Sequence, residues 1–334
     1  MSGREPADGD TLRDPLEEAL RIIASARDHG LTVRLMGGLA FHALVPEWMA
    51  NVARDGRDID LATRARDGRE FSNLLGELGY IADKQYNALY GHKQLYFVDP
   101  ARERPLDVLI DRLEMCHRLE FGGRLALDYP TLDPSDLLLT KLQIVKVTRK
   151  DLLDMLALLS ELPMSPPEED VHKIEIDRIA SITGQDWGWW RTVTGNLEKL
   201  QAFIGDDLRP DELELGRPPR FSLREQLGAL SAAIEAAPKS TRWRIRARVG
   251  ERMPWYEEPE EVGHGRYARA ADFASEIASI HIAAEASCDS KSSLDSRGAI
   301  RESDGEVALE VTEDDVRRCG RDGLRPPVVI RHDH

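Results

Sequence analysis

The chain has 334 residues, 41% of them hydrophobic, so it is able to bury one large core or two modest ones. Its formal net charge of -15 at pH 7 repels nucleic acid as a whole, so such a partner requires a local basic patch. Three scattered cysteines argue against a disulfide scaffold, and a polar N-terminus argues against a signal peptide. The lack of an apolar run of roughly 20 residues argues against a membrane partner. Together these features predict a cytoplasmic protein.

The first predicted elements alternate between helix and strand. A helical period over residues 15–29 is followed by a short apolar strand over 31–36, which ends at Gly37 and Gly38. The residues after the two glycines favour a helix, so the glycines occupy a strand–turn–helix junction. Polar residues and a proline predict a loop or insertion over 46–57.

Strands and helices continue this pattern through the first half of the chain. Alternating polar and apolar residues predict a strand at 58–62, and two strand-like runs at 93–98 and 105–111 favour a hairpin. Apolar periodicity predicts helices over three segments: 69–80, 134–147 and 151–162. This order predicts an α+β fold in which a small mixed sheet has flanking helices.

The second half of the chain is predicted to be helical and then disordered. Helical periodicity recurs after a Pro- and Glu-rich linker in three segments: 167–183, 187–204 and 223–236. A last amphipathic helix is expected at 266–284, before a Ser-, Asp- and Arg-rich remainder. We therefore expect four regions: a flexible tail (1–12), a core domain (13–162), a helical domain (163–257) and a helix with a largely disordered tail (258–334).

Three aspartates occur in strand-like surroundings. Asp58 and Asp60 are two residues apart, so a strand directs both side chains to one face while Ile59 turns toward the core. Asp107 interrupts an apolar run, where a charge normally requires a partner or a metal ion. Converging carboxylates repel one another, and a divalent cation such as Mg²⁺ or Mn²⁺ relieves that repulsion and also coordinates phosphates.

The two glycines and one lysine supply complementary features. Without Cβ atoms, Gly37 and Gly38 let the backbone approach a phosphate closely, and the following helix offers unpaired N–H groups to the anion. Lys141 lies in the apolar face of a predicted helix, where it either snorkels to solvent or meets an anion. These features together predict a site for the phosphates of a nucleotide.

The order of these motifs resembles the polymerase-beta-type nucleotidyltransferase superfamily over roughly residues 15–162. The resemblance rests on a Gly-Gly turn after an apolar strand, Asp-x-Asp on the next strand, and a third aspartate in a later apolar strand. The run Leu137–Leu142 and the later Lys150-Asp151-x-x-Asp154 element resemble the AbiEii-like proteins of toxin–antitoxin systems. Gly38 departs from the pattern, because many members have a serine there that contacts a phosphate.

The resemblance implies a metal-dependent nucleotidyltransferase that moves a nucleoside monophosphate from an NTP to an acceptor. It implies metal ligation and catalysis by Asp58, Asp60 and Asp107, and nucleotide binding by Gly37, Gly38, Lys141 and Asp154. The acceptor is open between RNA, a protein and a small molecule, and an antitoxin or a second copy of the chain is a further expected partner. The alternative function is a catalytically inactive nucleotide-binding or regulatory module.

Simpler structural interpretations of the same residues are also open. Asp111, four residues after the third aspartate, is expected to be a solvated carboxylate at a strand end. Ion pairs are an alternative for the charged residues: Asp107 with Arg104 or Arg112, and Lys141 with Asp151 or Asp154.

A basic segment at residues 239–252 is the best candidate for contact with RNA. It carries alternating arginines around Trp243, and basic residues with an interleaved aromatic ring suit an RNA backbone and a stacked base. Four nearby glutamates are able to neutralise the arginines: Glu257, Glu258, Glu260 and Glu261. A tryptophan cluster is instead expected to belong to the core of the helical region: Trp187, Trp189 and Trp190.

Overall fold

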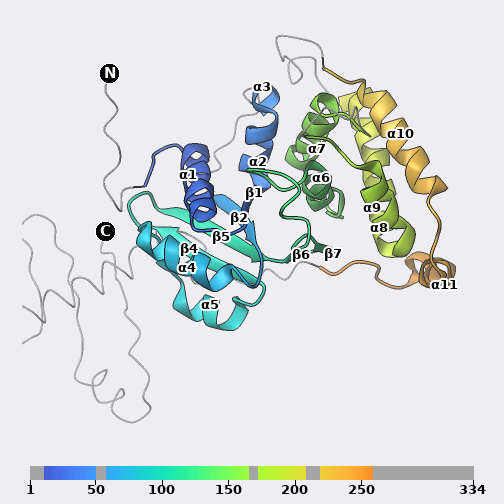
Figure 1. The fold of residues 1–334 in the computed structure, drawn as a ribbon. Helices are drawn as coiled ribbons and strands as arrows, with labels where there is room; N and C mark the ends of the chain where they lie inside the picture. Colours follow the sequence, from blue (N-terminus) through green and yellow to red (C-terminus); the bar gives the residue numbers. More distant parts are fainter. Residues whose placement is uncertain (1–10, 50–57, 165–171, 208–218, 259–334) are drawn as a thin grey trace, which may run out of the picture. The chain divides into compact units, whose positions relative to one another are not determined.

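The computed structural model describes residues 11–49, 58–164, 172–207 and 219–258 (Figure 1). The chain divides into two units, residues 1–274 and 275–334, and every described residue belongs to the first. Most of the predicted terminal tails and the helix expected at 266–284 lie outside the described residues. The four-region division expected from the sequence therefore stays a prediction.

A five-stranded mixed sheet forms the centre of the N-terminal half, with strand order β1-β2-β5-β4-β3. Strands β2 and β5 pair in parallel, and the other three pairings are antiparallel. Its strands are β1 (Val33–Met36), β2 (Ile59–Thr63), β3 (Ile81–Ala82), β4 (Gln94–Asp99) and β5 (Arg104–Ile110). A separate two-stranded ribbon follows, formed by β6 (Arg112–Glu114) and β7 (Arg118–Glu120). The predicted hairpin is confirmed as β4 and β5, whereas β3, β6 and β7 were not predicted.

The helices of the N-terminal half flank this sheet (Figure 1). They are α1 (Pro15–Asp28), α2 (Gly37–Leu44), α3 (Pro46–Met49), α4 (Gly68–Glu77) and α5 (Lys84–Tyr90). Helix α1 begins where the Asp14 carboxylate accepts a hydrogen bond from the backbone N–H of Glu17, which satisfies one of the unpaired donors of the first turn. Its buried residues recur at helical spacing and complete one apolar face.

Among the described residues, six α-helices follow the ribbon. They are α6 (Pro134–Leu142), α7 (Arg149–Glu161), α8 (Ile176–Gln185), α9 (Trp187–Ala202), α10 (Leu223–Ala236) and α11 (Thr241–Val249). Short π- and 3-10-helices follow α9 and α11, at Phe203–Asp207 and Gly250–Arg252. Helix α10 packs against α7, α8 and α9, and α6 packs against the same three helices. The described residues therefore confirm an α+β fold with a helical C-terminal region, and none of its helices is long and apolar enough to cross a membrane.

Three predicted segments differ from the structure. Of the helix expected near 167–183, the described part becomes helical only at Ile176, where α8 begins, because Ile174 pairs with Met164 in an extended bridge. The helix expected over 134–147 ends at Leu142, because the Asn196 side-chain amide donates hydrogen bonds to the carbonyls of Leu142 and Ile144 and so satisfies groups that a continuing helix would pair. The loop expected at 46–57 begins instead with the short helix α3, whose Trp48 is buried in the core. Burial of this large ring favours an ordered turn over an open loop.

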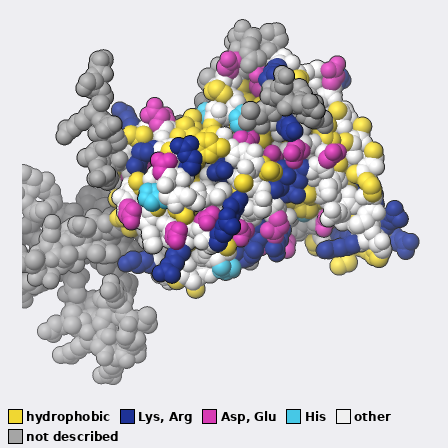
Figure 2. Space-filling model, in the orientation of Figure 1, with side chains coloured by type: hydrophobic (Ala, Val, Ile, Leu, Met, Phe, Trp, Pro, Cys, Tyr) yellow, Lys and Arg dark blue, Asp and Glu magenta, His cyan; other side chains and the backbone are white. Residues whose placement is uncertain are grey.

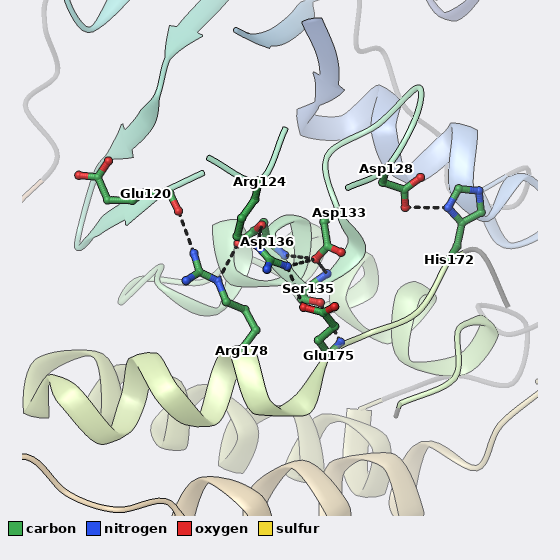
Figure 3. Close-up of polar contacts among 9 residues, drawn as sticks. All are labelled: Glu120, Arg124, Asp128, Asp133, Ser135, Asp136, His172, Glu175 and Arg178. Atoms are coloured by element: carbon green, nitrogen blue, oxygen red, sulfur yellow. Dashed lines mark hydrogen bonds and ion pairs between the residues drawn. The ribbon is translucent and has the colours of Figure 1, made fainter. Parts of the chain in front are cut away.

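The helix α6 is held to its neighbours by a network of charged side chains (Figure 3). Arg124, from the segment after β7, donates hydrogen bonds to Asp136 at 2.6 Å, Asp133 at 3.0 Å and Glu175 at 2.9 Å. Arg178 of α8 donates to the second oxygen of Asp136 at 3.1 Å. Because Asp136 is only 1% exposed, burial raises its pKa, and the two arginines oppose that effect. The network connects the first turn of α6 with α8.

The same region is stabilised by caps and by a second ion pair. Asp133 is the N-cap of α6 and accepts hydrogen bonds from the backbone N–H groups of Ser135 and Asp136. His172 lies 2.8 Å from a carboxylate oxygen of Asp128, and this contact raises the pKa of the imidazole (Figure 3). The Asp133 cap fixes the start of α6, the helix that carries Lys141.

We predict that Arg124→Met lowers the free energy of unfolding by about 3 kcal/mol, because removal of one partner leaves buried carboxylates without full compensation. Arg118→Met is the matched control, since Arg118 and its partner Glu120 are 59% and 56% exposed and such pairs contribute about 1 kcal/mol or less. Urea-induced unfolding measures both changes. Equal losses in the two variants would contradict the role assigned to the network.

Candidate active site

Two of the three predicted aspartates lie side by side on adjacent parallel strands. Asp60 of β2 pairs in register with Asp107 of β5, so both side chains leave the same face of the sheet at the same level. Ile59 and Leu61 point to the opposite face and are fully buried. Asp58 immediately precedes β2 and is exposed. The structure therefore brings Asp60 and Asp107 together and places Asp58 directly before the first residue of β2.

The Asp60 carboxyl experiences a strongly unfavourable electrostatic environment. Its pKa is raised from 3.8 to about 7, first by burial and then by the negative charges of Asp107 and Asp58. Lys141 and Lys150 act in the opposite direction, with smaller effects. A carboxyl in such surroundings is stabilised either by a proton or by a cation that binds beside it.

The donor set of the site consists of carboxylate oxygens, the ligands that Mg²⁺ and Mn²⁺ prefer. Within the described ranges, no three His, Cys, Asp or Glu side chains are gathered closely enough to hold a metal ion. The Asp60–Asp107 pair fits a divalent cation through its chemistry and its mutual repulsion, and Asp58 is close enough to add to that repulsion. The metal site itself stays a prediction.

Gly37 accommodates the Asp60 carboxylate. Gly37 is the first residue of α2 and has a φ of 62°, in the region that favours glycine. A Cβ atom at this position would lie 1.9 Å from Oδ2 of Asp60. Strand β1 positions Gly37 next to Asp60, because the last residue of the strand, Met36, pairs in register with Asp60. In the structure, the group that approaches Gly37 closely is thus a carboxylate. Contact of Gly37 and Gly38 with a phosphate stays a prediction.

Lys141 connects the site to the helical region. Its ammonium lies 2.8 Å from Oδ1 of Asp151 and 3.1 Å from Oδ2 of Asp154, and Asp154 is fully buried. The same nitrogen lies 5.8 Å from the ring centroid of Phe41, on α2. The sequence left open whether Lys141 pairs with these aspartates, and the structure confirms that it does. It also lies within electrostatic reach of Asp60.

Residues around Asp107 that sequence reasoning missed come from β4 and α5. The Gln94 amide donates a hydrogen bond to Oδ1 of Asp107. Tyr96 pairs in register with Asp107 across the β4–β5 hairpin. Tyr86 of α5 packs edge-on against Tyr96, with ring centroids 6.1 Å apart. The pKa values of both phenols are raised, first by burial and then by the negative charge of Asp107. The hairpin predicted from the sequence could have identified these residues. The pairing of Asp99 with Arg104 at its turn sets which residues of β4 lie opposite Asp107.

The simpler interpretations of the charged residues are partly resolved. Arg104 pairs with the buried Asp99 at 2.8 Å, and Arg112 pairs with Glu114 at 2.7 Å, so both arginines have partners other than Asp107. Asp111 lies beyond the end of β5 with a φ of 59°, and its carboxylate accepts a hydrogen bond from the backbone N–H of Ala65. It supports a turn at the strand end.

The tryptophan cluster and the basic segment meet near α9 and α11. Trp187 and Trp189 are buried, as expected, and Trp190 is partly buried. Residues 241–249 form α11, so most of the predicted basic segment is helical. Of the glutamates expected to neutralise it, Glu258 pairs instead with Lys146, whereas Glu260 and Glu261 lie outside the described residues. Contact of this segment with RNA stays a prediction.

We predict that Gly37→Ala displaces the Asp60 carboxylate and destabilises the fold by about 1–3 kcal/mol, because the new Cβ overlaps the carboxylate and the backbone lies at positive φ. Gly76→Ala is the matched control, since no atom lies within 4 Å of a Cβ at that helical position. The control is expected to be neutral or stabilising by up to ~1 kcal/mol. Thermal unfolding followed by circular dichroism compares them, and equal transition temperatures would refute the close contact.

We predict that Asp60→Asn stabilises the metal-free protein at high pH. Between pH 3.8 and about 7 the unfolded chain has released a proton that folded Asp60 still holds, so wild-type stability falls as pH rises through this window. Asparagine removes that loss, and we expect a gain on the order of 2 kcal/mol at about pH 8 relative to about pH 4. Urea unfolding at both pH values measures it.

Asp28→Asn is the control for this pH dependence, because Asp28 is 71% exposed. Its effect on stability is expected to change little with pH. A stability difference for Asp60→Asn that is likewise independent of pH would show that Asp60 has an ordinary pKa in the folded protein.

Comparison with known proteins identifies no family for this chain. Neither protein-family descriptions nor curated proteins match the sequence. Solved structures that match include the solution structure of the antibiotic-resistance factor ANT(2'')-Ia, at 16% sequence identity and a TM-score of 0.29, over 43% of this chain and 82% of that chain. A similarity of this size establishes neither a shared fold nor a shared activity.

Proposed function

We propose that the protein is a nucleotidyltransferase that moves a nucleoside monophosphate from an NTP to a hydroxyl acceptor. The observation that supports this function is the register pairing of Asp60 with Asp107, on a sheet face bordered by Gly37 and within electrostatic reach of Lys141. A structural protein has no need for two adjacent carboxylates, one of which has its pKa raised to about 7 by burial and then by the negative charge of its neighbours.

Asp58, Asp60 and Asp107 are the residues that would hold Mg²⁺ or Mn²⁺. A bound divalent cation would supply charge neutralisation for the phosphates and for the attacking and leaving oxygens. The chain's own contribution is to present carboxylates on adjacent strands, where the backbone pairing holds them in place. Gln94 contributes as well, because its amide donates to one oxygen of Asp107 and restricts the rotation of that carboxylate.

The reaction exchanges a phosphoanhydride linkage for a phosphodiester linkage. The acceptor oxygen bonds to the α-phosphorus of the NTP, the bond from that phosphorus to the bridging oxygen breaks, and pyrophosphate leaves. Asp107 is the candidate general base and takes the acceptor proton through its carboxylate. Gly37 and Gly38 are proposed to lie along the triphosphate at the start of α2, where the helix offers N–H groups without side-chain caps.

Lys141 and Asp154 are proposed to support the nucleotide site together. Lys141 is charge-compensated by Asp151 and Asp154 in the structure, and the buried position of Asp154 fixes the ammonium near α2. An arriving triphosphate would share this ammonium with the two aspartates. The toxin–antitoxin role implied by the family resemblance, with its antitoxin partner, remains a proposal of the same kind.

A second candidate function is a nucleotide-binding or regulatory module without catalysis. Three observations favour it, of which the first two are that Asp58 is exposed and that the described residues contain no preformed cluster of three metal ligands. Lys141 is also already paired with two carboxylates. Binding of an NTP without turnover would distinguish this module from the enzyme.

We predict that Asp60→Asn and Asp107→Asn each reduce nucleotidyl transfer by about 100-fold or more, because each removes a carboxylate from the proposed catalytic pair. The assay incubates the full chain with each labelled NTP, Mg²⁺ or Mn²⁺ and cell lysate, and follows label into RNA, protein and small molecules. Asp28→Asn, on the exposed end of α1, is the matched control and is expected to retain full activity.

Three outcomes of this experiment would decide between the functions. Transfer that survives in Asp60→Asn would refute the proposed roles of the carboxylate pair. Wild-type binding of Mg²⁺–NTP, without label in any acceptor, would favour the regulatory module. Absence of both binding and transfer would refute both functions.

A further inference from the structure

A large cavity of about 1080 Å³ lies at α9 and α11 and includes no residue of the carboxylate pair. This volume is slightly above the usual range for ligand sites, roughly 300–1,000 Å³. Its aromatic wall is formed by the start of α9 and the segment after the 3-10 helix: Trp187, Trp189, Trp255 and Tyr256. Charged residues of both signs also line it: Arg118, Arg242 and Arg246, together with the carboxylates of Asp186 and Glu257.

The cavity has an ordered wall. His117, which lies between β6 and β7, packs on Trp189 with ring centroids 5.0 Å apart, and its Nε2 lies 2.8 Å from the hydroxyl of Thr192. The Trp255 indole donates to the same hydroxyl at 3.2 Å. A Cβ on Gly188 would lie 2.4 Å from the Trp255 carbonyl, so the segment after α11 packs directly on α9.

Arg246 completes this wall. Its guanidinium donates to the carbonyls of Gly250, Met253 and Pro254, at distances from 2.6 to 3.1 Å. It also lies 4.7 Å from the ring centroid of Trp187, in cation–π contact. Arg246 therefore holds the segment that presents Trp255 to the cavity, and both of its terminal nitrogens already donate hydrogen bonds within the protein.

The other arginines of α11 are exposed on two sides of the helix: Arg242 lies on the cavity side, and Arg244 and Arg248 lie on the other side, because residues two apart do not share a helix face. Arg242, Arg244 and Arg248 are exposed, and none makes a hydrogen bond or ion pair through its side chain with the part of the chain that the structure describes. Residues 239–252 contain six basic residues and one acidic residue, although the whole chain carries a net charge of -15. Figure 2 shows Lys and Arg side chains gathered at the end of the molecule where Figure 1 places α11.

The cationic surface of α11 adjoins exposed aromatic and apolar groups. Trp255 and Tyr256 are half-buried, with ring centroids 5.3 Å apart, so each keeps part of its ring accessible. Ile245 lines the cavity and is 60% exposed. A ligand that matches this surface combines several negative charges with planar rings whose faces are free to stack.

Single-stranded nucleic acid has this combination of properties. Its phosphates are spaced along a backbone, which matches arginines spread along one helix, and its unpaired bases stack on aromatic side chains. A duplex keeps its base faces inside the stack, so it would engage the arginines alone. We propose that the exposed surface of α11 and the adjoining cavity bind single-stranded nucleic acid, with one phosphate on Arg242 beside the cavity, another on Arg244 across the helix, and a base against Trp255 or Tyr256.

This binding does not depend on the proposed transferase activity. The experiment uses the full chain and labelled oligonucleotides of roughly 12 residues, within the usual site size of such proteins. Fluorescence anisotropy measures affinity at several salt concentrations for a single-stranded RNA, a single-stranded DNA of the same sequence, and an RNA duplex. Quenching of tryptophan fluorescence reports stacking in the same samples.

We expect the single strands to bind more tightly than the duplex, to quench tryptophan fluorescence, and to lose affinity with salt in proportion to about two or three phosphate contacts. The Arg242→Ala/Arg244→Ala double variant is expected to bind about 10-fold more weakly, with a shallower salt dependence. The matched control is Arg66→Ala/Arg69→Ala, which removes two exposed arginines near α4 and is expected to bind like wild type.

A second variant tests the stacking separately. Tyr256→Ala is expected to weaken binding by about 5-fold or more and to change the salt dependence little, whereas Tyr256→Phe retains a ring and binds like wild type. Asp60→Asn is expected to bind normally, so loss of transfer and loss of binding are distinguishable. A higher affinity for RNA than for DNA, or the reverse, identifies the sugar. No binding at low salt, equal affinity for the duplex, or equal losses in both arginine double variants would overturn the proposal.

Discussion

The parallel pairing of β2 with β5 is the interaction on which the candidate active site depends. It places Asp60 beside Asp107, although 46 residues separate them in the chain, and it leaves both on one face of the sheet. The repulsion that follows is offset neither by Arg104 nor by Arg112, which have other partners. The fold therefore retains an electrostatic cost at this position, and such costs concentrate at functional sites more often than in purely structural regions.

The surrounding elements restrict how this cost is relieved. Gly37 leaves space for the Asp60 carboxylate, Gln94 holds one oxygen of Asp107, and Lys141 approaches from the helical region with its own two carboxylate partners. The position of Lys141 depends in turn on α6, whose first turn is fixed by Arg124 and its acidic partners. One helix, α6, therefore carries both the contacts of Arg124 and the lysine that lies near the carboxylate pair.

The distribution of charge separates the molecule's two candidate binding regions. The carboxylate pair is suited to a cation and to phosphates that arrive with it, whereas α11 carries exposed arginines that suit a polyanion directly. The net charge of the whole chain argued against binding of nucleic acid, but that value averages over every surface of the protein. The local surface differs from that average, since helical geometry collects the alternating arginines of residues 241–249 within a length of roughly 13 Å.

Local pattern predicted most of the elements and the first members of the site, because the strand period of Asp58–Leu61, the glycines at a strand end and the apolar face around Lys141 are properties of short segments. Contacts between distant segments were not readable in this way. The sequence did not reveal that Gln94 and Tyr96 face Asp107, that Asn196 ends α6 at Leu142, or that Arg246 joins the segment after α11 to Trp187. Register, helix termination by a distant side chain and cavity walls depend on which surfaces meet in three dimensions, and only the packed chain determines that.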